Sequence, residues 1–467
     1  MVQEREGRWN RAALGGFVAV VLWLIVIYGP GIGHGFVKDD VAWVAANRVT
    51  SLAEARALLL RSNGFYRPIV AASFAVDRAI YGIEPLGYGI TNLLLLIASA
   101  AALAWAARGV GLSAIGAIIA AAVWAFNFHG IHMAVLWLSG RTELWLVLCA
   151  FLSAGALARR WPILTGIAAL AAMLAKEEAV MLPAMLAGWA IVLADGSGSA
   201  RDRLRAAVRQ TWVAWLALAI YFVLRSHTGA YTPSTSPWFY QFTFDPFRVV
   251  TNAGEYLDRA CTFSLLAAAL CALLAWRRPT WTPMVRRCTL LALLWLIGGY
   301  ALTVFLPVRS SLYACLPSGG MAILSALLIV TLWESIQVPA QRRRVLAAVV
   351  VPVLLLPVYW SRNERWVELA DLGGDVFATV RQILREQPDV RQLVFEDDRD
   401  TRRSLLNTYG ALLPPAVTLA AGRAIPVWLD PPPDDWRGSD LVNPAESTPV
   451  GPMAVVRLRQ DRLERVR

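Results

Sequence analysis

Residues 88–107 read YGITNLLLLIASAAALAWAA and contain no charged side chain. An α-helix needs about 20 apolar residues to cross the hydrocarbon core of a bilayer. The remaining sequence has the same character: 57% of the 467 residues are hydrophobic, only 16% are charged, and the mean hydropathy is +0.51. Soluble domains are about 25% charged. The composition therefore excludes a soluble, fibrous or disordered protein and predicts an α-helical polytopic membrane protein.

Apolar stretches of similar length recur along the chain and predict about eleven transmembrane helices. Between the fifth and the sixth, Lys176, Glu177 and Glu178 indicate a tight turn rather than one long helix. The predicted spans lie near residues 12–29, 88–107, 112–128, 134–157, 162–176, 178–194, 211–226, 260–276, 288–306, 318–337 and 345–360.

Arginine-rich loops follow every second predicted span. Loops rich in Lys and Arg stay in the cytoplasm, so the amino terminus is predicted to be cytoplasmic and the carboxyl terminus extracytoplasmic. We interpret the net charge of +11 as this loop charge, not as a nucleic-acid site. The first span is interpreted as an uncleaved anchor, since no small-x-small cleavage site ends it. The loops contain Arg108, Arg159, Arg160, Arg201, Arg203, Arg205, Arg209, Arg277, Arg278, Arg286, Arg287, Arg342, Arg343 and Arg344.

The sequence predicts two domains. Residues 1–360 form the transmembrane domain, whose first outer loop covers about 30–87. Residues 361–467 are predicted to be a soluble extracytoplasmic domain. A helical pattern over 363–387 and a strand-like stretch at 392–395 predict a small α/β unit there.

Two motifs of the first outer loop carry groups that suit chemistry at a membrane surface. Asp39 and Asp40 are paired carboxylates, which serve as a general base or hold a divalent cation. Arg67, in Tyr66-Arg67-Pro68, suits a lipid phosphate because its planar fork binds two oxygens. Taken alone, the motifs also fit a solvated acidic loop and an arginine that reaches an ordinary headgroup.

Further charged groups are predicted at the outer ends of later spans, where ionisable side chains usually have a function. Arg141 and Glu143 lie near the outer end of the fourth span. The chain has 44 lysines and arginines, of which only Lys38 and Lys176 are lysines, and both stand beside carboxylates. After the ninth span, Arg309 and Tyr313 are one helical turn apart. These groups can bind a phosphate, or pair with neighbours for structural reasons alone.

Metal binding stays open at the level of sequence. The five cysteines form no CxxC motif, which argues against a zinc ribbon or a disulfide framework. His129 and His132 have a spacing seen in metal sites, but no third ligand lies nearby, so interface polarity is favoured. The cofactor is left unknown, with Asp39, Asp40, His129 and His132 as weak candidates for holding Mg²⁺ or Mn²⁺.

As an ordered set, the motifs resemble the GT-C glycosyltransferases, membrane enzymes that use polyprenyl-phosphate sugars. The resemblance covers about residues 10–370 and is greatest to the bacterial relatives of the protein O-mannosyltransferases that carry TPR repeats. The matching segments are Asp39-Asp40 with Ala42 and Asn47, Tyr66-Arg67-Pro68, Gly87-Tyr88-Gly89-Ile90-Thr91-Asn92-Leu93-Leu94, Leu138-Ser139-Gly140-Arg141-Thr142-Glu143-Leu144, Ala175-Lys176-Glu177, Leu312-Tyr313 with Leu316-Pro317-Ser318, and Arg362-Asn363 with Trp366.

The sequence departs from the family pattern at several points. Family members often have His at the position of Gly89, and Arg-Tyr where Ser311-Leu312 precede Tyr313. Arg309 then takes over the role of that arginine from a shifted position. No TPR repeats are visible, which puts a protein acceptor in doubt.

The resemblance implies an inverting transfer of a sugar from a polyprenyl phosphate to an acceptor hydroxyl of a lipid, glycan or protein, on the outer face of a bacterial inner membrane. Asp39 is then the base, with Asp40 second. Four residues are expected at the donor phosphate: Arg67, Lys176, Arg309 and Tyr313. Four others are expected to support them: Tyr66, Arg141, Glu143 and Glu177. Asp39, Arg67, Lys176 and Arg309 should converge in one cavity, with Glu143 or Glu177 holding Lys176 or Arg141.

Two other functions are compatible with many spans and outer charges. One is a flippase or transporter of lipid-linked glycans, although the charges cluster at one rim and no repeat is visible. The other is a ligase or polymerase of the O-antigen type, although such enzymes place their Arg and His in a late outer loop. A non-enzymatic scaffold would not need charges at the rims of spans four to six.

Overall fold

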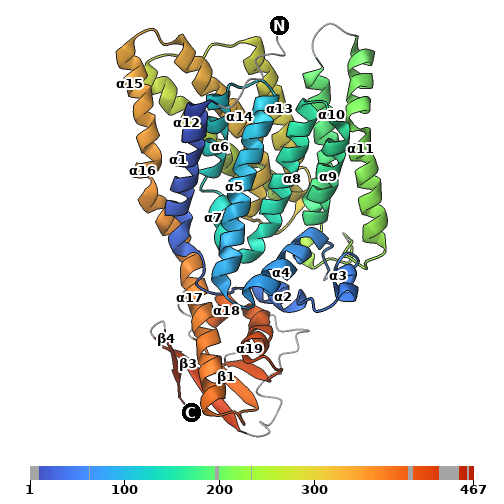
Figure 1. The fold of residues 1–467 in the computed structure, drawn as a ribbon, viewed down its shortest axis with the longest axis vertical. Coiled ribbons are helices and arrows are strands. Elements are labelled where there is room, and N and C mark those ends of the chain that lie inside the picture. Colours follow the sequence, from blue (N-terminus) through green and yellow to red (C-terminus); the bar gives the residue numbers. More distant parts are fainter. Residues whose placement is uncertain are drawn as a thin grey trace.

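Long apolar helices run side by side through most of the structure, and a small sheet lies beyond one end of them (Figure 1). The computed structural model describes residues 10–62, 64–194, 199–232, 234–397, 403–430, 452–459 and 462–466. The first described helix begins at the end of the bundle far from this sheet (Figure 1). The predicted carboxyl-terminal domain falls partly outside the described residues.

All eleven predicted segments are helical. In the described part of the chain, seven helical stretches are long and apolar enough to cross a membrane, which confirms the polytopic membrane class. The number eleven stays a prediction, because α6, α9 and α10 have only 12, 14 and 12 residues. The helices of the bundle are α1 (Arg11–Tyr28), α5 (Pro85–Gly109), α6 (Ala114–Ala125), α7 (Ile131–Leu136), α8 (Arg141–Ala158), α9 (Pro162–Ala175), α10 (Leu182–Leu193), α11 (Ala200–Ser226), α12 (Pro246–Ala275), α13 (Pro283–Tyr300), α14 (Cys315–Ser335), α15 (Pro339–Ala347), α16 (Val351–Leu354) and α17 (Leu356–Glu386).

The predicted fourth span is interrupted near its outer end. Helix α7 stops at Leu136, a short 3-10 turn η3 (Leu138–Gly140) follows, and α8 starts at Arg141. The turn is tight, because a Cβ on Gly140 would stand 2.7 Å from the Ala134 Cα. As a result, Arg141 and Glu143 lie in the first turn of a new helix, at the end of the bundle that carries the first loop.

The first outer loop folds into three helices, α2 (Asp39–Ala46), α3 (Leu52–Leu58) and α4 (Pro68–Tyr81). They lie across the lower end of the bundle, on the side of the sheet (Figure 1). Pro68 occupies the first position of α4, where its missing N–H costs nothing. Arg67 is thereby fixed directly before the helix.

The carboxyl-terminal part is a small α/β unit, as predicted. Its sheet has the order β2-β1-β3-β4, in which β1 pairs in parallel with β2 and β3 and only the β3–β4 pair is antiparallel. The elements are β1 (Gln392–Glu396), β2 (Val427–Asp430), β3 (Met453–Arg459), β4 (Arg462–Arg465), α18 (Leu405–Thr408) and α19 (Leu413–Ala421). Helix α17 enters this unit from the bundle without a break, so residue 360 falls inside a helix (Figure 1).

The small sheet and the first outer loop share one hydrophobic core. Leu393 and Phe395 of β1 belong to the same buried cluster as Val41 of α2 and Phe74 of α4. Val376 on α17 joins the two groups. The packing therefore fixes the carboxyl-terminal unit against the loop that carries Asp39.

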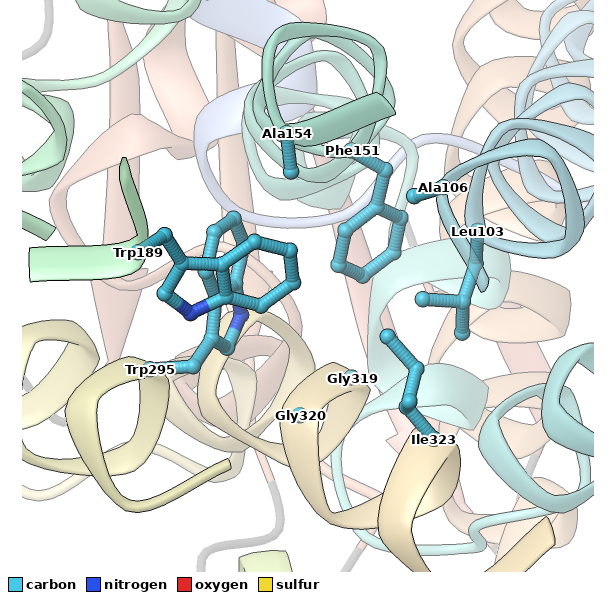
Figure 2. Close-up of a pocket in the computed structure, with 9 residues that line it drawn as sticks. All are labelled: Leu103, Ala106, Phe151, Ala154, Trp189, Trp295, Gly319, Gly320 and Ile323. Carbon is cyan, nitrogen blue, oxygen red and sulfur yellow. The ribbon is translucent and has the colours of Figure 1, made fainter. Parts of the chain in front are cut away.

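A small gap in the middle of the bundle is entirely apolar. Figure 2 shows Phe151, Trp189 and Trp295 around it, with Gly319 and Gly320 on the adjoining helix. The space is too narrow to admit a water molecule, and the two indole N–H groups donate to backbone carbonyls. This region is packed core without reactive groups, so any chemistry must take place elsewhere.

Candidate active site

Asp40 ties the start of α2 to the break between α7 and α8. One carboxylate oxygen accepts hydrogen bonds from the backbone N–H and the hydroxyl of Ser139, both at 2.6 Å, and the other accepts from the Val37 N–H at 3.0 Å. The side chain is completely buried. Burial raises the pKa of Asp40 to about 7, although the bonds from Ser139 and Val37 act in the opposite direction. Both oxygens are occupied, so Asp40 fixes the loop.

Asp39, the neighbouring residue, has a different environment. It is exposed, and among the described residues its carboxylate has no hydrogen-bond or ion-pair partner. Loss of hydration to the surrounding protein raises the pKa of Asp39 from its ordinary value, against the lowering effect of Arg67 and Lys38. Asp39 is therefore an accessible carboxylate with a raised pKa, and both properties suit a general base.

Arg67 and Glu177 form a forked ion pair between the first loop and the turn η4 (Glu177–Met181). The Arg67 Nε and Nη2 atoms lie 3.0 and 2.7 Å from Glu177 Oε2. Arg225 at the end of α11 approaches the other oxygen at 3.7 Å. The guanidinium also lies over the Phe65 ring, at 4.4 Å. This pairing uses one edge of the Arg67 fork and leaves Nη1 without a partner among the described residues.

Lys176 lies beside this pair in a buried cluster. Its Nζ is 2.6 Å from Glu143 and 2.6 Å from Glu178, and 4.8 Å from the centre of the Tyr313 ring. Only 7% of the Lys176 side chain is exposed. Glu143 holds Lys176 as expected, whereas Glu177 holds Arg67 instead.

Tyr240 lies among the charged groups of the site. It lies in the short helix η5 (Trp238–Tyr240), and its ring packs edge-on against Phe65 at 5.3 Å. The charges of Arg67, Lys176 and Asp39 all act on its hydroxyl, although burial is the main reason why the pKa of Tyr240 is raised. Residues from the first loop, the α9–α10 turn and the second outer loop therefore meet around one tyrosine.

The other predicted site residues lie around this group. Arg309 is half-exposed and pairs with Glu255 on α12, so it lies to one side of the Lys176 cluster. The Lys176 ammonium lies over the Tyr313 ring, which packs edge-on against the Tyr256 ring, 6.1 Å away. The Tyr66 hydroxyl donates to the Leu59 carbonyl at 2.8 Å and holds α3 to the loop before α4.

Arg141 is an internal support. It is fully buried, and its guanidinium contacts Asp77 of α4 at 2.6 Å and Asn92 of α5 at 3.0 Å. The guanidinium also lies 4.0 Å from the centre of the Phe74 ring. Arg141 thus joins α4, α5 and α8, and its carboxylate partner is Asp77 rather than Glu143 or Glu177.

The described residues contain no group of three or more His, Cys, Asp or Glu side chains arranged to hold a metal ion. His129 and His132 lie near Arg362, whose positive charge would repel a metal cation. Burial first and Arg362 second lower the pKa of both histidines, to about 4 for His132. Asp40 has its two oxygens occupied, which leaves Asp39 as the accessible carboxylate of the pair.

Several residues of the group were not among the sequence candidates. Glu178 directly follows the quoted Lys176 motif, and its charge was visible beside the lysine. Tyr240 belongs to a run of aromatic residues in an outer loop, a signal that composition alone could have found. Asp77 and Ser139 act through contacts distant in sequence, which no local pattern reveals.

This architecture is the GT-C fold, the fold class that the sequence predicts. The crystal structure of ArnT from Cupriavidus metallidurans in the apo state matches with a TM-score of 0.50 and 13% identity, over 89% of this chain and 86% of ArnT. ArnT bound to undecaprenyl phosphate gives 0.49 at 13% identity, over 88% and 85%. The apo oligosaccharyltransferase of Archaeoglobus fulgidus gives 0.46 at 10% identity, over 88% and 64%. At these identities the likeness concerns the fold alone.

The chain is also similar in sequence to a named transferase. It is 33% identical over 187 residues to the Protein O-mannosyl-transferase Tmtc1 of Drosophila melanogaster. The match covers 36% of this chain and 22% of Tmtc1, so the chain spans about a fifth of that relative. No family model matches the chain. The resemblance stated from the motifs is confirmed, and the chain is a multi-pass membrane protein with a GT-C fold.

Proposed function

We propose that this chain is an integral membrane glycosyltransferase. It moves a sugar from a polyprenyl-phosphate donor to an acceptor hydroxyl of a lipid, glycan or protein. The observation that carries the proposal is the unpaired Asp39 carboxylate beside Arg67, at one end of a GT-C bundle. The lipid in the second ArnT structure belongs to the same chemical class as the proposed donor.

The proposed reaction is a single displacement at the anomeric carbon. Asp39 accepts the proton of the acceptor hydroxyl while the acceptor oxygen forms its bond to that carbon. The bond between the carbon and the phosphate oxygen breaks, and the phosphate leaves with the electron pair. Attack opposite to the leaving group inverts the configuration.

The departing phosphate gains negative charge, which nearby cations stabilise. Arg67 is the best placed because its Nη1 edge points away from Glu177 and is available for two oxygens. Lys176 lies over the Tyr313 ring, and Glu143 and Glu178 balance its charge. Arg309 approaches from the side of α12. In the proposed site, Tyr66, Arg141, Glu143 and Glu177 hold these groups in position.

We further propose that the end of the bundle with α2–α4 faces the outside of a bacterial inner membrane. The arginine-rich loops then lie in the cytoplasm together with the amino terminus. Residues 1–360 supply the catalytic membrane domain and residues 361–467 the extracytoplasmic domain. No nucleic acid takes part, and the sugar is left open.

A transfer assay on reconstituted protein tests this function. Proteoliposomes receive a panel of polyprenyl-phosphate sugars, with a membrane extract as the source of acceptors, and release of polyprenyl phosphate is measured. Asp39→Asn should abolish release at unchanged protein yield. Glu84→Gln, which removes an exposed carboxylate just before α5, should have no effect. Full activity of Asp39→Asn would rule out the proposed base.

A further inference from the structure

An aromatic segment at the same end of the bundle is unusually exposed. Trp238, Phe244 and Phe247 have exposed fractions of 72%, 75% and 82%. The sequence from 226 to 244 contains no Asp, Glu, Lys or Arg. Exposed apolar clusters of this kind mark interaction sites. We name residues 237–247 the aromatic strap.

The backbone of the aromatic strap is fixed to the rest of the protein. The Thr243 N–H donates to the Phe305 carbonyl at 2.8 Å, and the Val308 N–H donates to the Phe239 carbonyl at 3.2 Å. The ring of Phe244 packs on that of Phe305, with centroids 5.6 Å apart. The exposure is therefore a property of the fold, since the backbone is held and the rings still point outward.

The strap continues into the lipid-facing surface of the bundle. Phe247 lies in the first turn of α12, a helix long and apolar enough to span a membrane. Further along α12, Val250, Leu257 and Leu265 are exposed as well. The exposed rings of the strap thus form one continuous exposed apolar surface with these α12 side chains.

The opposite side of the strap belongs to the charged site. Tyr240 follows Trp238 by two residues, and its ring packs on Phe65, which lies against the Arg67 guanidinium. This short segment therefore has an exposed apolar face on one side and a tyrosine close to Arg67 on the other. A lipid with a phosphate head and a long apolar chain fits this arrangement, because its phosphate can reach Arg67 while its chain lies along the exposed rings.

We propose that the aromatic strap binds the isoprenoid chain of the lipid-linked donor and leads its phosphate past Tyr240 to Arg67. The inference rests on the proposed function for the identity of the donor. Burial of a Phe side chain contributes roughly 1.5–3 kcal/mol, so two rings suffice for a measurable share of lipid affinity. The contact is with the chain, and its strength should depend on chain length.

The test measures binding rather than transfer, so its failure differs from failure of the proposed function. Purified full-length protein is titrated with undecaprenyl phosphate and, separately, with the two-isoprene analogue geranyl phosphate. The variant replaces Phe244 and Phe247 with Ser. Trp281→Ser is the control, because this exposed aromatic lies in an arginine-rich loop just before α13.

We expect the double variant to bind undecaprenyl phosphate about tenfold or more weakly, as loss of about 1.4 kcal/mol predicts, and to bind geranyl phosphate unchanged. The control should resemble the wild type with both ligands. Equal loss for both ligands would mean that the strap only supports the fold of the phosphate site. Unchanged binding of both would mean that the strap contacts ordinary bilayer lipid. Either result overturns the proposal.

A photoreactive diazirine on one of the isoprene units that directly follow the first two of undecaprenyl phosphate gives a second measurement. Cross-links should map to residues 237–247 in the wild-type protein. Cross-links confined to other helices would also overturn the proposal.

Discussion

The Arg67 guanidinium and the Glu177 carboxylate form a forked pair across 110 positions of the sequence. The pair joins the first outer loop to the turn between α9 and α10. It orients Arg67 so that one edge is used for structure and the other stays available. Bidentate arginine pairs add geometric specificity as well as free energy.

Glu177→Gln should therefore impair donor binding. The neutral amide cannot hold the guanidinium in the same plane, so we expect the KM for donor to rise about tenfold, as loss of about 1.4 kcal/mol predicts. Transfer kinetics at varied donor concentration measure this rise. Glu386→Gln is the control, because it removes a carboxylate from an exposed pair with Arg465 in the carboxyl-terminal unit. A rise in KM no larger than that of the control would contradict the orienting role of Glu177.

The pH dependence of transfer should report on Asp39. A general base works in its ionised form, so the rate increases as pH rises through the pKa of the base. Because loss of hydration raises the pKa of Asp39 above 3.8, the acid limb of kcat/KM should lie at a higher pH than that of an ordinary aspartate. The profile of the wild type is measured between pH 4 and 8. A kcat/KM that does not fall on the acid side of this range would mean that another group is the base.

Gly373 on α17 makes room for the loop that leads to Asp39. A Cβ at this position would stand 2.4 Å from the Phe36 carbonyl oxygen, too close for any real contact. Gly373→Ala should push this loop away and lower kcat by about tenfold, or about 1.4 kcal/mol of barrier, with a smaller change in donor KM. Gly254→Ala is the matched control in helix α12, because nothing lies within 4 Å of the added carbon. Equal activity of the two variants would show that the close packing does not control the loop.

Arg141 should matter for stability more than for binding. Arg141→Leu leaves Asp77 buried without its partner, and loss of one member of a buried pair costs about 3–5 kcal/mol. We expect a clearly lower melting temperature in detergent, with only a small rise in donor KM in the protein that remains folded, because Arg141 contacts Asp77 and Asn92 rather than the donor-binding groups themselves. Arg209→Leu, at an exposed position of α11, is the control. A normal melting temperature for Arg141→Leu would contradict the role as a support.

The sequence predicted the helices well because a membrane leaves the backbone few choices. Residues 88–107 became the centre of α5, since a helix satisfies every backbone group inside an apolar medium. The break at Gly140 was not predictable in the same way. It depends on Ser139 meeting Asp40, 99 residues earlier, and on the fit of Gly140 against α7.

In the candidate site too, local features could be predicted from the sequence, whereas contacts between distant residues could not. Sequence patterns placed Arg67, Glu143 and Lys176 at one rim, because charges in apolar surroundings stand out. They did not predict the partners, since ion pairing is decided by the fold. The expected partners of Arg141 were Glu143 or Glu177, whereas the structure pairs it with Asp77 of α4, 64 positions earlier in the sequence.

Helix α17 has one more consequence. Its 31 residues extend over about 46 Å, at 1.5 Å per residue, from the bundle into the carboxyl-terminal unit. Along this length Gly373 touches the backbone of Phe36, and the Thr408 carbonyl of the adjoining α18 accepts the Lys38 N–H. The loop that carries Asp39 is therefore packed against the middle of one continuous helix. A molecule that binds the carboxyl-terminal unit and shifts α17 would therefore also move the loop that carries the proposed base.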